Sequence, residues 1–136
     1  MAGPLAEVRA LCVDLPEVSE RLSHGEPTWF VRGKKVFVNF AGRHHDDRVA
    51  LWCASLVDER DALVAARPTR FFVPPYVGGR GWLGVYLDVP DVDWAEVDEL
   101  IRDAYRLIAP KRLVAVLEQS EPEAGRPEPD PGQAGT

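Results

Sequence analysis

Apolar residues near the N-terminus recur with the period of an α-helix. They occupy three- and four-residue steps at Leu5, Val8, Leu11, Cys12 and Leu15. Pro4 suits the first turn of a helix, where its missing N–H costs no hydrogen bond. Pro16 interrupts the pattern, and the segment after it has room for further helical turns. The spacing therefore predicts a helix over residues 4–22 that bends near Pro16.

The next stretch has the two-residue period of a β-strand. Val36, Val38 and Phe40 alternate with their neighbours in TWFVRGKKVFVNFA, which has β-branched and aromatic residues on both sides of Gly33. Because glycine suits a tight turn, residues 28–41 are predicted to form a β-hairpin. A polar loop, GRHHDD, then leads to a third predicted strand, RVALWCA.

The second half of the chain returns to the helical period twice. Ser55 is the expected N-cap of a helix that ends at Pro68. FFVPPYV is predicted to be extended, but its paired prolines exclude it from a central strand; a GGRG turn and the strand WLGVYLDV follow. Asp93, with Glu96 three residues later, predicts a capped helix over residues 93–108, and KRLVAVLEQ predicts a short closing helix.

The order of these elements predicts the fold class. A helix, three strands, a helix, two strands and a last helix indicate a two-layer α+β domain, in which helices cover one face of a five-stranded antiparallel sheet. Residues 1–118 are expected to form this single domain. Residues 119–136 are rich in proline and glycine and lack large apolar side chains, so they are predicted to be a disordered tail.

Composition limits the classes of function. The formal charge of −6 argues against a strongly cationic nucleic-acid coat, although the tail alone carries four acidic residues and one basic one. Residues 1–118 are thus near neutral, at −3. No apolar run approaches the ~20 residues of a membrane span, so no membrane partner is expected. Two cysteines without a CxxC pair indicate free thiols, a reducing compartment and therefore the cytoplasm.

Few residues have the spacing of a catalytic or metal site. His44, His45, Asp46 and Asp47 are the only adjacent metal-capable side chains, and we interpret them as a polar loop. Cys53 lies in an apolar strand with no neighbouring base, which favours a core cysteine over a nucleophile. The sequence therefore predicts a non-enzymatic protein without a cofactor or a metal.

Basic residues gather at the predicted turns. The candidate phosphate-binding residues are Arg32, Lys34, Lys35, Arg43, Arg80, Lys111 and Arg112. Cationic side chains at loop tips can bind phosphates while a sheet holds them in position. The nearby aromatic residues Trp29, Phe37 and Trp82 could stack on bases. The pattern predicts a small basic edge on a nearly neutral domain.

Four separated blocks of sequence resemble the MmcQ/YjbR family. They are SHGEPTWFVRGKKVF, LWC, FFVPPYVGGRGWLGVYLD and AYRLIAPKRL, within a resemblance that runs over residues 1–117. The resemblance implies a fold similar to the frataxin-like CyaY proteins and DNA binding through two β-hairpin wings. The wings here would be the Arg32–Lys35 hairpin and the loop through Gly78–Gly81. Many members carry a lysine directly before the tryptophan that matches Trp82, whereas here Arg80 stands two positions before it.

Three functions follow from these observations. The first is binding of duplex DNA by the basic turns. The second is a protein-interaction adaptor that uses aromatic residues on the open face of the sheet, expected to be Trp29, Phe37, Trp52, Trp82 and Tyr86. The third, by analogy with the frataxin fold, is a small-ligand or iron site on an acidic first helix that carries Glu7, Asp14, Glu17 and Glu20.

Overall fold

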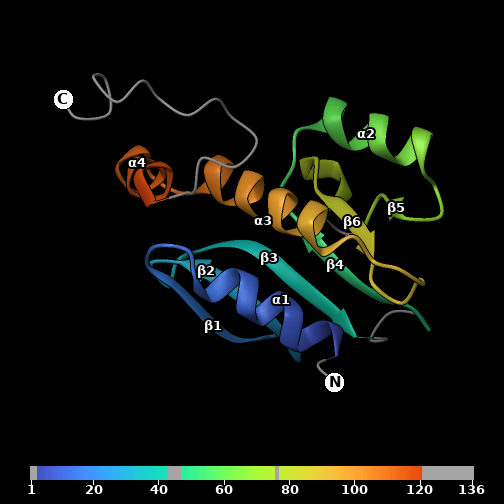
Figure 1. Ribbon diagram of the computed structural model, residues 1–136, viewed down its shortest axis with the longest axis horizontal. Coiled ribbons are helices and arrows are strands. Elements are labelled where there is room, and N and C mark those ends of the chain that lie inside the picture. The colour runs from blue at the N-terminus through green and yellow to red at the C-terminus, as the bar shows by residue number, and fades with distance from the viewer. Residues whose placement is uncertain (1–2, 43–46, 76, 121–136) are drawn as a thin grey trace.

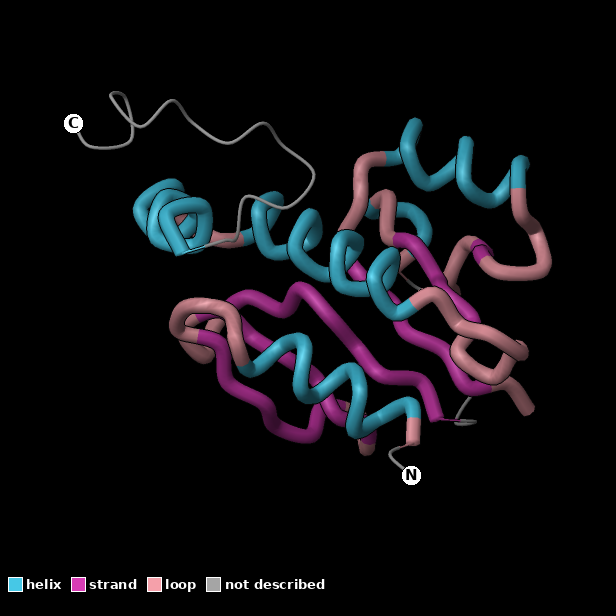
Figure 2. Tube along the Cα trace, viewed as in Figure 1, coloured by secondary structure: helices cyan, strands magenta, loops and turns pink. Residues whose placement is uncertain are grey.

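The computed structural model describes residues 3–42, 47–75 and 77–120, which form a sheet with helices packed on it (Figures 1 and 2). Its elements are α1 (Pro4–Val13), β1 (Val18–Ser23), β2 (Glu26–Val31), β3 (Lys35–Gly42), β4 (Val49–Cys53), α2 (Val57–Ala66), β5 (Phe71–Phe72), the 3-10 helix η1 (Gly78–Arg80), β6 (Leu83–Tyr86), α3 (Trp94–Ile108) and α4 (Lys111–Ser120). None of the helices in these described ranges is long and apolar enough to cross a membrane.

The sheet has six strands in the order β1-β2-β3-β4-β6-β5, and every neighbouring pair is antiparallel. Figure 1 shows α1 and α3 lying across the same face of this sheet. α2 packs beside the edge strand β5, and its Leu63 shares a small cavity with Leu100 of α3 and Leu83 of β6. The predicted α+β class and the single helical layer are therefore confirmed.

The predicted first helix is wrong beyond Val13. Pro16 has no backbone N–H to donate, and Glu17 adopts a left-handed conformation with φ 56°, so the chain leaves the helix there. Residues 18–23 instead form β1, which pairs along its whole length with β2. This strand is the sixth, where the sequence predicted five. Its side chains are mostly exposed, so it carries no alternating apolar pattern.

The predicted β2–β3 hairpin is confirmed. Its turn closes through the Lys34 N–H and the Val31 carbonyl at 3.0 Å, and Arg32 and Gly33 both have positive φ (55° and 67°). Two successive residues with positive φ are typical of a type I′ turn, whose twist matches that of the flanking strands. A β-bulge follows, because Trp29 pairs with Val38 but Phe30 pairs with Val36. The β2–β3 hairpin therefore has a tight turn and a twist that the turn type and the bulge determine.

The bulge places an extra residue, Phe37, in β3. Its fully buried ring lies edge-on to Tyr105 of α3, with ring centroids 5.7 Å apart and an interplanar angle of 81°. Edge-to-face pairs add to the free energy gained by burial. The Tyr105 hydroxyl donates to the Pro16 carbonyl at 2.8 Å, which ties α3 to the segment before β1. Phe37 and Tyr105 thus join the sheet to its helical layer.

The elements predicted in the second half are confirmed with one correction. β5 is an edge strand, as the following prolines require, and Asp93 caps α3 by accepting from the Glu96 N–H at 3.1 Å. The correction concerns α2, because Leu56 and not Ser55 is its N-cap residue, and the Ser55 hydroxyl donates to the Leu56 carbonyl. The closing helix α4 includes the first two residues of the predicted tail, and residues 121–136 lie outside the described ranges.

Cross-strand pairing shows which side chains share each face of the sheet. Cys53 pairs with Leu83, and both line the small cavity beneath α2 and α3, so they face the helices. The next pair, Trp52 and Gly84, therefore lies on the opposite side, which we call the open face. Phe72 on β5 continues the same row. The aromatic residues of the open face are Phe30, Trp52, Phe72 and Tyr86.

We expect Gly84→Ala to destabilise the protein through Phe72. A Cβ atom at Gly84 would lie 2.4 Å from the Phe72 ring, which is stacked on Tyr86 with centroids 4.5 Å apart. Displacing that ring should lower the free energy of unfolding by about 1–3 kcal/mol. Urea unfolding of the wild type, of Gly84→Ala, of Phe72→Ala and of the double variant measures the coupling energy between these two positions. If Gly84→Ala lowers the free energy of unfolding equally with and without the Phe72 ring, the proposed clash between residue 84 and this ring is wrong.

Candidate nucleic-acid interface

Strand direction brings both predicted wings to the same end of the sheet. β3 begins at Lys35, directly after the turn, and its neighbour β4 ends at Cys53 on that side. Cys53 pairs with Leu83, the first residue of β6, so η1 and Arg80 precede β6 at this end as well. The two hairpin tips are therefore held by the pairing of the strands behind them.

The C-terminal half of α3 reaches the same end. Tyr105 bonds to Pro16, and the Arg32 N–H donates to the Glu17 carbonyl at 2.8 Å, which joins the segment before β1 to the β2–β3 turn. α4 begins three residues after α3 ends and lies at this end in Figure 1. We call the assembled surface the basic end; it comprises Arg32, Lys34, Lys35, Arg80, Lys111 and Arg112.

Most charges of the basic end are exposed and available. Among the described residues, Lys34, Lys35, Arg80 and Lys111 have no carboxylate within ion-pair distance. Arg32 differs, because its Nε donates to Glu17 at 3.1 Å. Exposed lysines without a partner are well hydrated and can each neutralise a phosphate at little cost. The free cations are thus mainly lysines at the β2–β3 turn and at the start of α4.

The two hairpin tips are separated across the end of the sheet. β4 lies between the β2–β3 and β5–β6 pairs, so the centres of these pairs are three strand spacings apart. At about 4.8 Å per strand this is roughly 14 Å, close to the ~12 Å width of the major groove of B-DNA. Arg80 at the second tip lies 5.9 Å from the Trp82 ring centroid. A spacing of this size would allow one polyanion to reach both tips.

The seventh predicted phosphate-binding residue, Arg43, lies outside the residues that the structure describes.

The aromatic residues expected to stack on bases are buried. Phe37 is 0%, Trp29 1% and Trp82 3% exposed, so none of the three offers a free ring face. Trp29 and Phe37 pack among the core residues and do not belong to the open face, contrary to the prediction. Phe30 and Phe72 lie on the open face without having been predicted there, because their positions follow from the bulge and from the pairing of β5.

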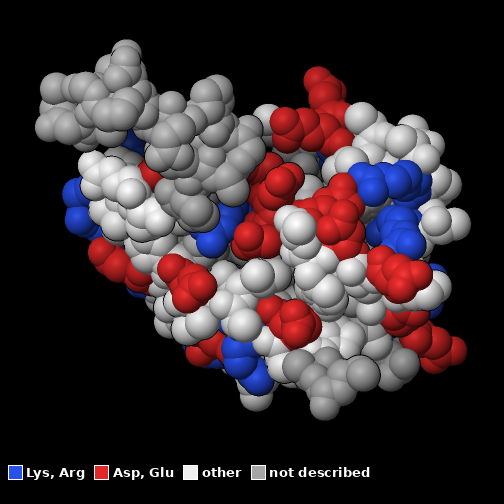
Figure 3. Space-filling view, viewed as in Figure 1, with Lys and Arg blue, Asp and Glu red and all other residues white. Residues whose placement is uncertain are grey.

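The helical face of the molecule is mainly acidic. Figure 3 shows Asp and Glu side chains over the middle of this face, whereas basic side chains gather at its left edge near α4 and in a patch on the right. Several arginines here are already paired, for example Arg102 with Asp98 at 3.0 Å and Arg106 with Asp103 at 3.1 Å. The middle of the helical layer therefore has an acidic surface, in contrast to the basic end.

Comparisons with known proteins support the family resemblance of the sequence and the fold of the structure. The YjbR family model matches residues 13–107, more than half of the chain. The chain belongs to the YjbR family. A solved structure with a similar fold is the Deinococcus radiodurans protein DR2400, described as a DUF419 domain, with a TM-score of 0.65, 19% identity and coverage of 94% of this chain and 92% of that one. A search of curated proteins finds no significant match.

The frataxin analogy for an iron site does not fit this YjbR protein. Glu17 lies in a turn and Glu20 in β1, so the four acidic residues expected on one helix are distributed over three local structures. Glu20 is occupied by Arg9, whose guanidinium bonds both of its oxygens at 2.8 Å and lowers the pKa of its carboxyl. Within the described ranges no group of His, Cys, Asp or Glu could hold a metal ion; His44, His45 and Asp46 lie outside them.

Both cysteines are core residues. Cys12 is 0% and Cys53 1% exposed, and they are not bonded to each other. Burial raises the pKa of the Cys53 thiol to about 12 and that of Cys12 further still. A thiol that stays protonated at neutral pH is a poor nucleophile. The interpretation of Cys53 as a structural residue therefore agrees with its surroundings.

We expect neither thiol to react with Ellman's reagent while the protein is folded. The reagent needs an accessible thiolate, and both burial and the raised pKa values remove it. In guanidinium chloride both cysteines should react within the mixing time. Rapid release of one equivalent of chromophore from the native protein would show that one of these side chains is accessible.

Proposed function

We propose that this YjbR protein binds the phosphate backbone of nucleic acid, duplex DNA first, with its basic end. The observation that carries the proposal is the convergence of six of the seven basic residues named from the sequence on one end of the sheet. Strand pairing fixes the two hairpin tips, and the α3–α4 connection adds Lys111 and Arg112. This YjbR protein would thus hold DNA without a catalytic step.

Electrostatics supports a modest affinity that depends strongly on salt. Residues 1–118 have a net charge of −3, so attraction comes from the local basic end and not from the whole protein. Each phosphate neutralised releases counterions, and the logarithm of the binding constant falls by about 0.9 per contact for each tenfold rise in salt. Contacts to phosphates carry no sequence information, so we propose that binding is largely independent of DNA sequence. The two free thiols fit a cytoplasmic setting.

A protein-interaction adaptor is the second candidate, and the open face favours it. Four aromatic residues line that face, and Arg21 and Arg48 lie over two of the rings, at 3.6 Å from the Phe30 centroid and 3.8 Å from the Tyr86 centroid. Phe30 and Trp52 are only 8% exposed, so the accessible aromatic surface comes mainly from the stacked pair Phe72 and Tyr86. We rank the basic end first because it has several exposed cationic side chains, whereas the open face has only these two partly exposed rings.

The decisive variant reverses both lysines of the β2–β3 turn. Lys34→Glu with Lys35→Glu should weaken binding to a short fluorescein-labelled duplex at low salt and reduce the salt slope by about one per lysine. Fluorescence anisotropy over a salt series measures both quantities. The variant should keep its fold, because both side chains are exposed and have no ion-pair partner among the described residues.

Arg70→Glu serves as the control for one charge reversal, because Arg70 precedes β5 at the other end of the sheet, where Phe71 pairs with Val85. This variant should leave the salt slope unchanged. Two results would overturn the proposal: no measurable binding of the wild-type protein at low salt, or binding that the double lysine variant retains with the same salt slope.

A further inference from the structure

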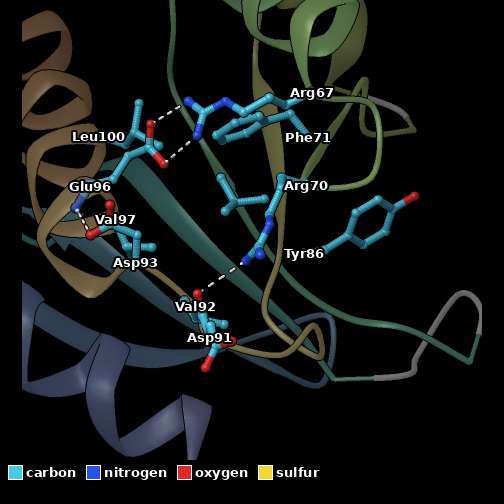
Figure 4. Close-up of a pocket in the computed structure, with 11 residues that line it drawn as sticks. Arg67, Arg70, Phe71, Tyr86, Asp91, Val92, Asp93, Glu96, Val97 and Leu100 are labelled. Atoms are coloured by element: carbon cyan, nitrogen blue, oxygen red, sulfur yellow. Dashed lines mark hydrogen bonds and ion pairs between the residues drawn. The ribbon is translucent and has the colours of Figure 1, made fainter.

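A second pocket opens at the other end of the sheet, between β5, β6 and the start of α3 (Figure 4). Its volume is about 310 Å³, at the lower limit of about 300 Å³ for small-molecule sites. The floor is apolar and is formed by Phe71, Val85, Val97 and Leu100. None of the residues of the basic end lines this pocket.

Arg70 is the polar group of this pocket with the most unused bonding capacity. Its side chain is half-buried, and one nitrogen, Nη1, donates to the Asp91 carbonyl at the long distance of 3.3 Å. Among the described residues, no carboxylate lies within ion-pair distance of it. Figure 4 shows the Arg70 guanidinium over the pocket and the Asp91 carboxylate turned away from it. A guanidinium has five N–H donors, so most of those of Arg70 are free for a ligand.

Three of the other four charged side chains of the pocket, those of Arg67, Asp93 and Glu96, are already bonded. Arg67 donates to both oxygens of Glu96, at 3.1 and 2.5 Å, and lies 4.8 Å from the Phe71 ring centroid. The bond to Glu96 raises the pKa of Arg67. Asp93 accepts from the Glu96 N–H and caps α3. These bonds leave Arg70 as the cation that still needs an anion.

We propose that this pocket binds a small organic carboxylate with an apolar body. The carboxylate would pair with Arg70, and the body would lie on the floor formed by Phe71, Val97 and Leu100. Planar carboxylates match the fork of a guanidinium in a bidentate arrangement. Asp91, Asp93 and Glu96 make the surroundings acidic, which disfavours a dianion such as phosphate. The volume limits the ligand to roughly the size of a substituted benzoate.

Sodium benzoate is the probe, followed by ¹H–¹⁵N correlation spectra of the full chain. We expect saturable shifts, with a Kd on the order of 1 mM, confined to amides near residues 67–72, 85–86 and 91–97. Arg70→Gln should weaken binding roughly tenfold or more, because a charge-assisted bond is lost. Glu96→Gln should strengthen it several-fold, since it removes a carboxylate and loosens Arg67. The two variants shift affinity in opposite directions, so a general loss of structure cannot imitate both.

Arg80→Gln is the matched control, because it removes the same charge outside the pocket and should leave the benzoate affinity unchanged. Benzamidine, a cation of the same shape, and inorganic phosphate should both bind more weakly than benzoate. The proposal is overturned if benzoate gives no saturable shifts, if Arg70→Gln binds it as well as the wild type, or if either comparison compound binds as tightly.

Discussion

Antiparallel pairing is the interaction on which the other features of this protein depend. The register from β3 through β4 to β6 decides that the turn at Arg32 and the loop at Arg80 share one end of the sheet. The same register sends the chain before α3 to the other end, where Arg70 overlooks a pocket. Phe37 and Tyr105 then fix the helical layer against this sheet. Both the basic end and the pocket at Arg70 therefore depend on the order and direction of the strands.

The elements with a strong local signal could be predicted from sequence. The hairpin around Gly33 and the capped helix after Asp93 each combine a periodic apolar pattern with a turn or capping residue. β1 could not, because it is an exposed edge strand whose structure comes from pairing with β2. The basic residues could be identified as candidates from the sequence, but which of them lie at the same end of the sheet depends on the directions of the strands. Arg70 carried no sequence signal, because its pocket is formed by three separate elements.

Acidic and basic side chains are unevenly distributed over the surface of this protein. Acidic side chains cover the middle of the helical face in Figure 3, and most arginines there are paired with them. The free lysines lie at the ends of elements, where the sheet supports them. Repulsion from the helical face and attraction to the basic end would orient DNA on this protein. A net charge of −6 therefore describes the whole chain and not the local charge of the basic end.

The most direct measurement is a ¹H–¹⁵N correlation titration of the full chain with a short DNA duplex at low salt. We predict that the shifts concentrate on residues 32–35, 78–82 and 111–113, and that raised salt reverses them. We also predict that the amides of Phe72 and Tyr86, on the open face, do not shift. Shifts spread over the helical face, or centred on the open face with none at Lys34 and Lys35, would contradict the proposed function.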